Sequence, residues 1–276
     1  MNPFHSMRAR YFLIVFALLI CIEHNSKQLL ENTFHLPISF VTSLLVFYIL
    51  PSIWLWYEYR RYHVPFTSFI NKRGSFNLLQ VFMITAMLCL FSYGYLILYM
   101  YSFAWITPDF IMNTLYEPVI GHTGGYIYQF VMIVFVAPII GEFVFRGFLF
   151  QRFAAKWGTG KGMIGVALLF GCLHVEFLSA AVFSIVLSIV YIRSKSLLMP
   201  ISIHMLNNAT VLITSFIVSK ERMISFAEFS NHTTFVTGLI IFMIGLNLVL
   251  IFLFINRRYM SKDAPIIYTS KVREIW

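Results

Sequence analysis

Long apolar runs dominate the chain, and short polar segments separate them. A helix needs about 20 apolar residues to cross the hydrocarbon core of a bilayer. The pattern predicts about eight membrane-spanning helices, at residues 7–23, 36–57, 78–105, 126–150, 163–174, 178–192, 197–218 and 235–255. The fifth and sixth runs are the shortest, and they also fit a helical hairpin that turns near Glu176.

The composition narrows the class of protein. Of the 276 residues, 59% are hydrophobic and 11% are charged, whereas a soluble domain has about 45–50% apolar and about 25% charged residues. These values exclude a soluble globular, disordered, fibrous or disulfide-stapled protein. Apolar residues in continuous rather than alternating runs also argue against a transmembrane barrel. We therefore predict an all-α polytopic transmembrane helical bundle, in which residues 1–276 form a single membrane domain.

The positive charge is distributed as in a membrane protein. The chain carries a net charge of +9, and its basic residues lie at the ends of the apolar runs. One predicted side carries Arg8, Arg10, Arg60, Arg61, Lys72, Arg73, Arg152, Lys156, Lys161, Arg193, Lys195, Arg257, Arg258, Lys262, Lys271 and Arg273. The other side carries Lys27, Lys220 and Arg222. This asymmetry predicts an even number of spans with both termini in the cytoplasm. It argues against nucleic-acid binding, which needs cations along one surface.

The first apolar run follows Arg8 and Arg10, as in a signal peptide. No small-residue cleavage site follows the run, so we interpret it as an uncleaved first span. The sequence carries no organelle signal, and we expect a multi-pass protein of the cell membrane, compatible with a bacterial source. The lipid bilayer is then its first partner. Cys21, Cys89 and Cys172 lie inside apolar runs without CxxC or metal spacing, and we expect them to be buried hydrophobic residues.

Five polar residues inside the apolar runs are functional candidates, because a charged residue at the centre of a span costs about 2.5–3.5 kcal/mol. Glu142 and Arg146 lie four residues apart in the fourth run, so they share one helix face and can form an ion pair. His174 ends the fifth run. His204 and Asn208 lie four residues apart in the seventh run.

The depth of these residues suggests that they form one site. A rise of about 1.5 Å per residue from the nearest basic residue places Glu142, His174 and His204 in one layer, roughly 13–20 Å from the cytoplasmic ends of their helices. Such a layer resembles a buried polar site open to cytoplasmic water. The alternatives are an internal ion pair, a hydrogen-bonded core histidine and polar contacts between helices.

The residue types suit hydrolysis. A carboxylate can activate a water molecule, two histidines can orient that water or hold a metal, and an asparagine can donate to an oxyanion. A proton relay or an ion pathway would use similar groups.

These residues resemble the CPBP family of intramembrane proteases, named for CAAX processing and for bacteriocin processing or protection. The family has three motifs on separate helices: Glu-Glu-x-x-x-Arg, Phe-x-x-x-His and His-x-x-x-Asn. This chain carries them in the same order, as Gly141-Glu142-x-x-x-Arg146, Phe170-x-x-x-His174 and His204-x-x-x-Asn208. The motif-bearing core is residues 125–218.

The resemblance implies an activity and a site. His174, His204 and Asn208 would form the catalytic centre with Glu142, and Arg146 would support it through a pair with Glu142. The reaction would be peptide-bond cleavage in a membrane-associated peptide or protein, of the glutamate type or the metal type. A divalent metal such as zinc would have His174 and His204 as candidate ligands, with Glu142 completing the set if it faces inward, because catalytic zinc usually has three protein ligands.

The pattern departs from the family at one position. Gly141 stands where the family has its first Glu, the usual water-activating carboxylate. Adjacent side chains on a helix point about 100° apart, so Glu142 replaces that carboxylate only if the backbone near Pro138 and Gly141 turns it inward. The first hypothesis is thus an endopeptidase that uses Glu142 or another acid. The second is a family member with weakened catalysis that acts as a bacteriocin-immunity, scaffold or regulatory membrane protein. The third is a small transporter or channel.

Overall fold

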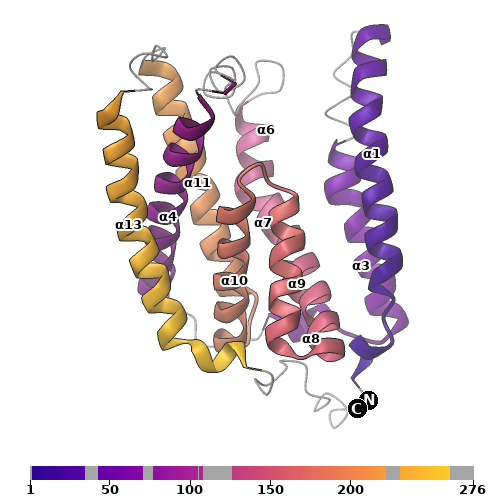
Figure 1. Ribbon diagram of the computed structural model, residues 1–276. Coiled ribbons are helices and arrows are strands. Elements are labelled where there is room, and N and C mark those ends of the chain that lie inside the picture. The colour runs from indigo at the N-terminus through magenta and orange to yellow at the C-terminus, as the bar shows by residue number, and fades with distance from the viewer. Residues whose placement is uncertain are drawn as a thin grey trace.

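The computed structural model describes residues 2–34, 43–70, 77–104, 106–107, 126–221 and 231–261. Within these ranges every regular element is a helix (Figure 1), which confirms the all-α prediction. The elements are η1 (Pro3–His5), α1 (Ala9–Phe34), η2 (Leu45–Ile49), α3 (Leu50–Arg61), η3 (Phe66–Phe69), α4 (Leu78–Ala104), α6 (Tyr126–Val131), η4 (Met132–Val136), α7 (Ala137–Glu142), η5 (Phe143–Phe150), α8 (Gln151–Trp157), α9 (Thr159–Cys172), α10 (Phe177–Ser194), α11 (Leu198–Glu221), α13 (His232–Ile255) and η6 (Arg257–Met260).

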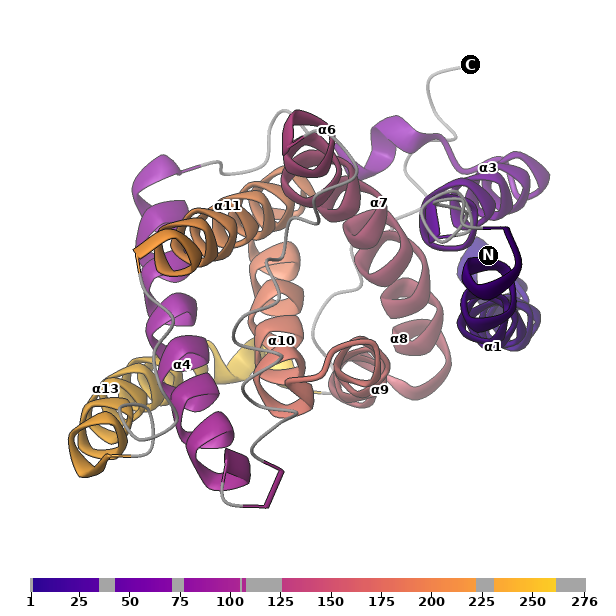
Figure 2. The same ribbon diagram turned by 90° about the horizontal axis from the view of Figure 1, so that it is seen from above.

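The bundle is built around α10. Seen from above, α10 lies between α4, α11 and α9, while α1 and α3 pair at one edge and α13 lies at the opposite edge (Figure 2). In the most apolar stretch of α10, 72% of the residues are buried, against 17% in α13. Two glycines allow α13 to pack closely on α4. A Cβ atom on Gly94 would collide with the backbone of Phe242, and one on Gly245 would collide with the backbone of Phe91. The polar residues near α10 are therefore enclosed by other helices.

Several helices are apolar and long enough to cross a membrane. Among the described residues there are four, at Leu78–Phe103, Met132–Trp157, Phe177–Ser194 and His232–Ile255. They correspond to the third, fourth, sixth and eighth predicted runs. Thr159–Cys172 and Leu198–Thr214 are shorter apolar helices in the fifth and seventh runs. The first run lies in α1, and the second run begins in residues 35–42, outside the described part, and continues as η2 and α3.

Helices α9 and α10 form the hairpin that the sequence allowed as an alternative. Helix α9 has 14 residues, which at about 1.5 Å per residue is about 21 Å, shorter than a hydrocarbon core of about 30 Å. A short turn connects α9 to α10, and the two helices lie side by side (Figure 1). Glu176 lies at the start of α10, where the turn was predicted. This turn carries His174.

The fourth predicted span is a continuous helix of changing pitch. Two π-helical stretches, η4 and η5, flank the short α7. At the end of η4 the Ala137 N–H donates to the Met132 carbonyl, five residues back, and Pro138 has no N–H to donate. A proline is a known cause of such irregular turns. The sequence pattern did not predict the π-helical stretches.

The first and last long helices meet the same end of the bundle. Helix α1 begins and α13 ends at the lower end in Figure 1. A chain that starts and finishes at the same side of a membrane crosses it an even number of times. The assignment of that end to the cytoplasm stays a prediction.

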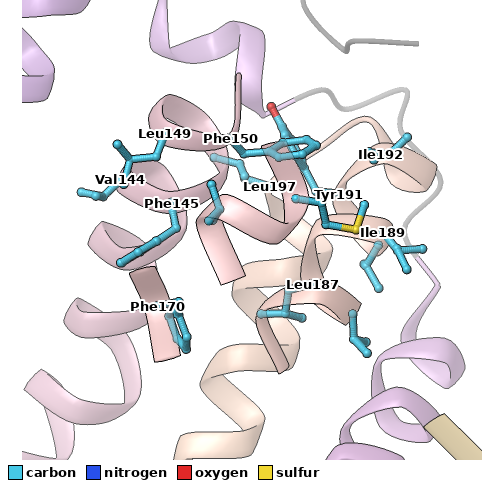
Figure 3. Packing of buried hydrophobic residues seen from close by; sticks show 14 of the residues in the cluster. Val144, Phe145, Leu149, Phe150, Phe170, Leu187, Ile189, Tyr191, Ile192 and Leu197 are labelled. Carbon is cyan, nitrogen blue, oxygen red and sulfur yellow. The ribbon is translucent and has the colours of Figure 1, made fainter. Parts of the chain in front are cut away.

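An aromatic and aliphatic core surrounds the lower half of α10. Side chains of η5, α9 and α10 interlock there, including Val144, Phe145, Phe170 and Leu187 (Figure 3). The rings of Phe145 and Phe170 meet edge to face at 5.0 Å, an arrangement that aromatic pairs prefer. This core positions η5 against α9. It thereby also positions Arg146, the polar residue that η5 carries.

Candidate active site

Glu142 lies at the centre of the candidate site. Its Oε1 accepts a hydrogen bond from Arg146 Nη1 at 2.9 Å and lies 2.9 Å from His204 Nδ1. Both Glu142 and Arg146 are fully buried, and His204 is 8% exposed. Because an ionised carboxylate only accepts, the proton of this contact is on His204 Nδ1, and the lone pair of the neutral imidazole is on Nε2. The carboxylate thus joins the fourth span to α11 and fixes the histidine tautomer.

Arg146 ties the same cluster to α9 and α10. Its Nη2 donates to the Ser184 carbonyl at 3.1 Å. Its guanidinium lies over the ring of Phe170, 5.1 Å from the ring centroid, within the range of a cation–π interaction. Three separate helices therefore hold this one buried cation.

Gly141 also faces His204. A Cβ atom on Gly141 would meet His204 Cε1 at 3.9 Å, an ordinary van der Waals distance. Apart from Gly141's chain neighbours and its own helix backbone, no other atom of the described residues would lie within 4 Å. Adjacent positions point about 100° apart, and an imidazole that lies between the two directions is within reach of both. Glu142 therefore points inward, and position 141 has room for a side chain.

The two histidines contact the same aromatic ring. His174 stacks on Phe170 with ring centroids 4.6 Å apart, and His204 meets Phe170 edge to face at 6.0 Å. His174 Nδ1 lies 2.8 Å from the Phe170 carbonyl, which only accepts, so Nδ1 donates and Nε2 keeps the lone pair. Phe183 of α10 packs on His204 from another side, at 5.1 Å. Phe170 thus contacts both imidazoles, a role that its position in the motif did not predict.

Asn208 makes a contact that its position in the motif did not predict. Its Nδ2 donates to the Ile133 carbonyl at 2.9 Å. Ala137 bonds to Met132 instead, and Pro138 has no N–H with which to continue the five-residue pattern to Ile133. Asn208 therefore supplies the hydrogen bond that the helix lacks at this carbonyl. Its predicted role as an oxyanion donor remains a prediction.

The cluster keeps unused hydrogen-bonding capacity. Glu142 Oε2, Arg146 Nε and Ser184 Oγ are buried and have no hydrogen-bond partner within the described residues. Unsatisfied polar groups of this kind cost about 1–3 kcal/mol each, and a catalytic role is one of the explanations for retaining them. A serine inside an apolar helix gave no signal by which sequence reasoning could have found Ser184.

The candidate site has few side chains that could bind a metal ion. In the described part of the chain, no group of three or more His, Cys, Asp or Glu side chains is arranged to hold a metal ion. Glu142 and His204 are bound to each other, and His174 uses Nδ1 on a backbone carbonyl. This donor set does not fit the usual three protein ligands of catalytic zinc.

The comparison with protein families supports the interpretation of the motifs. Residues 123–210 match the family model described as type II CAAX prenyl endopeptidase Rce1-like. This segment is less than half of the chain, and it contains all three motifs from Gly141 to Asn208. The match confirms the predicted likeness to the CPBP proteases for this part of the chain. Neither the curated proteins nor the solved structures give a significant match.

Proposed function

We propose that the protein is an intramembrane endopeptidase that hydrolyses a peptide bond in a membrane-associated peptide or protein. The observation that carries the proposal is the buried chain Arg146–Glu142–His204, with both contacts at 2.9 Å. A carboxylate on one imidazole nitrogen makes the other nitrogen a suitable general base, as in the triads of serine proteases. The match of residues 123–210 to a CAAX endopeptidase family points to the same reaction.

In the proposed reaction, His204 moves the proton. Neutral His204 Nε2 takes a proton from a water molecule, and the water oxygen attacks the peptide carbonyl carbon. Glu142 stabilises the resulting imidazolium, and Arg146 holds the Glu142 carboxylate in position through their 2.9 Å contact. His204 then returns the proton to the amide nitrogen, the C–N bond breaks, and an acid and an amine leave.

His174 has an assisting role in this proposal. It presents its Nε2 from the stacked face of Phe170, and it is exposed in the turn after α9. We assign it to orienting the attacking water or the substrate carbonyl. The distribution of Lys and Arg supports a cytoplasmic location for the turns at the lower end of the bundle, and we propose the cell membrane of a bacterium as the location.

Substitution of His204 tests the proposal. We expect His204→Gln to lower the rate of cleavage about 10²–10⁴-fold, the usual contribution of general acid–base catalysis. The measurement is mass spectrometry of membrane-anchored peptides incubated with the full-length protein in liposomes. The matched control is His232→Gln, an exposed histidine at the start of α13, which should keep the wild-type rate. Equal cleavage by His204→Gln and wild type would refute the role of His204.

A second function is favoured by the room beside Gly141. No carboxylate occupies this position, and Glu142 Oε1 is already engaged by Arg146 and His204. A protein with this arrangement that does not cleave would bind a membrane peptide through the same site, as a bacteriocin-immunity, scaffold or regulatory protein. This alternative predicts that the wild-type protein leaves bound peptides intact.

A further inference from the structure

A basic cavity lies where α1 begins and α8 ends, apart from the candidate active site. Its volume is about 440 Å³, within the size range of small-molecule sites. Within the described part of the chain, the lining includes four cationic side chains and no acidic one: Arg8, Arg10, Arg152 and Lys156. Such a concentration of one sign of charge attracts anions.

One of the four cations is partly buried and hydrogen-bonded to the opposite wall, and the other three are exposed at the mouth of the cavity. Arg152 Nε donates to the Met7 carbonyl at 2.7 Å, which fastens the N-terminal segment to α8. Phe4 and Met7 anchor that segment, since both are fully buried. The guanidinium of Arg10 lies 5.0 Å from the Tyr11 ring centroid.

The second wall of the cavity comes from α8. The Lys156 ammonium lies 5.4 Å from the ring centroid of Trp157. Aromatic contacts of this kind orient cations. Helix α8 therefore contributes positive charge to the cavity wall that faces the basic residues of the N-terminal segment.

The neighbouring side chains are of the kind expected at the level of the lipid headgroups. Immediately after Arg10, helix α1 exposes a series of large apolar side chains, among them Ile14 (56%), Leu18 (58%) and Ile22 (62%). Such an exposed apolar series is suited to contact with acyl chains. Trp157 is 45% exposed beside the cavity, as expected for an aromatic residue at a membrane interface.

One carboxylate offsets part of the basic charge at this cavity. Glu58 interacts with Arg61, and it interacts with Arg8 through both the backbone and the charged side chain. It is only 3% exposed and is not part of the lining. The cavity wall thus keeps its excess of positive charge.

We propose that this cavity binds the phosphate of an anionic phospholipid headgroup, with the acyl chains along the exposed apolar face of α1. Clustered basic residues at the cytoplasmic surface have this preference for anionic lipids. A free phosphate ion shares the headgroup's chemistry, but the adjoining apolar series on α1 gives a lipid a second contact that an ion cannot use.

Lipid titration of the full-length protein tests the proposal. Delipidated protein in a neutral detergent is titrated with phosphatidylglycerol, and with phosphatidylcholine of the same acyl chains, and the complexes are counted by native mass spectrometry. We expect tighter binding of phosphatidylglycerol. The double variant Arg10→Gln/Lys156→Gln should bind it about 25-fold more weakly, because each basic residue contributes about five-fold near an anionic surface.

Two further variants separate the cavity from charge in general. Lys161→Gln/Arg193→Gln removes two exposed cations from the same end of the bundle but outside the lining, and it should bind like wild type. Arg10→Lys/Lys156→Arg keeps the charge and should also bind like wild type. Thermal unfolding of each variant without lipid checks that the fold is retained.

Several outcomes would overturn the proposal. Equal affinity for the two lipids would contradict it, as would the same loss in both glutamine variants. Displacement of the lipid by submillimolar inorganic phosphate would assign the cavity to the free ion. Displacement by an acidic peptide at equal charge concentration would assign it to a protein partner.

Discussion

At the scale of single residues, the structure of the candidate site depends on the Glu142 carboxylate, which has two partners. Glu142 Oε1 is within 2.9 Å of both Arg146 and His204. Removing one member of a buried ion pair leaves the other charge uncompensated, which costs about 3–5 kcal/mol, whereas replacing both members is often neutral. The stability of this part of the bundle should therefore depend on the pair rather than on either residue alone.

We expect Glu142→Gln to lower the free energy of unfolding by about 3–5 kcal/mol. The double variant Glu142→Gln/Arg146→Met should recover most of that loss, because no buried charge is left without a partner. Denaturation of the two variants and Arg146→Met in detergent measures the coupling. Losses that simply add would show that Glu142 and Arg146 are not energetically coupled.

Sequence reasoning reached part of this site. The spacing of four residues predicted the pair of Glu142 and Arg146, and the 2.9 Å contact confirms it. The contact of Glu142 with His204 crosses between helices, so spacing along the chain placed the two residues only at a common depth. The room beside Gly141 depends on the path of α11 and was not predictable from the motif.

At the scale of elements, Asn208 compensates for a break in the fourth span. Pro138 cannot donate to the Ile133 carbonyl, and Asn208 of α11 does so at 2.9 Å. The π-helical stretches that accompany Pro138 were not predictable, because a proline shows that a bond is missing but not how the neighbouring turns adjust. The hairpin of α9 and α10 was predictable as an alternative, because the fifth run is too short to span.

We expect Asn208→Ala to destabilise the protein by about 1 kcal/mol, a typical value for a hydrogen bond between membrane helices. In a Pro138→Ala background the loss should be smaller, since residue 138 then has its own N–H for the Ile133 carbonyl. Thermal unfolding of the two single variants and the double variant provides the comparison. An undiminished loss in the Pro138→Ala background would contradict this role of Asn208.

At the scale of the whole molecule, the sequence predicted the class of fold and its direction in the membrane. Continuous apolar runs long enough to cross a bilayer form helices, because a helix satisfies its backbone hydrogen bonds within the segment. The all-α bundle was therefore predictable from the sequence. The number of crossings was harder to predict, because α9 is shorter than a full span and the apolar stretch of α11 covers only Leu198–Thr214. The common end of α1 and α13 agrees with an even number (Figure 1).

The orientation is testable by labelling. After replacement of Cys21, Cys89 and Cys172 by Ser, single cysteines are introduced as Lys161→Cys and His232→Cys, which lie at opposite ends of the bundle. A membrane-impermeant maleimide should label His232→Cys in intact cells and Lys161→Cys only after lysis, as the distribution of basic residues predicts. The reverse pattern would invert the predicted topology.

The most direct test of the central claim compares peptide cleavage by wild type, Gly141→Ala and Gly141→Glu in liposomes. If His204, held by Glu142, is sufficient as the base, wild type and Gly141→Ala cleave the membrane-anchored peptide, and Gly141→Glu is not required. The alanine variant controls for filling the space beside His204, where its methyl group fits at 3.9 Å. Cleavage by Gly141→Glu alone would contradict the claim and would assign the wild-type protein to binding without catalysis.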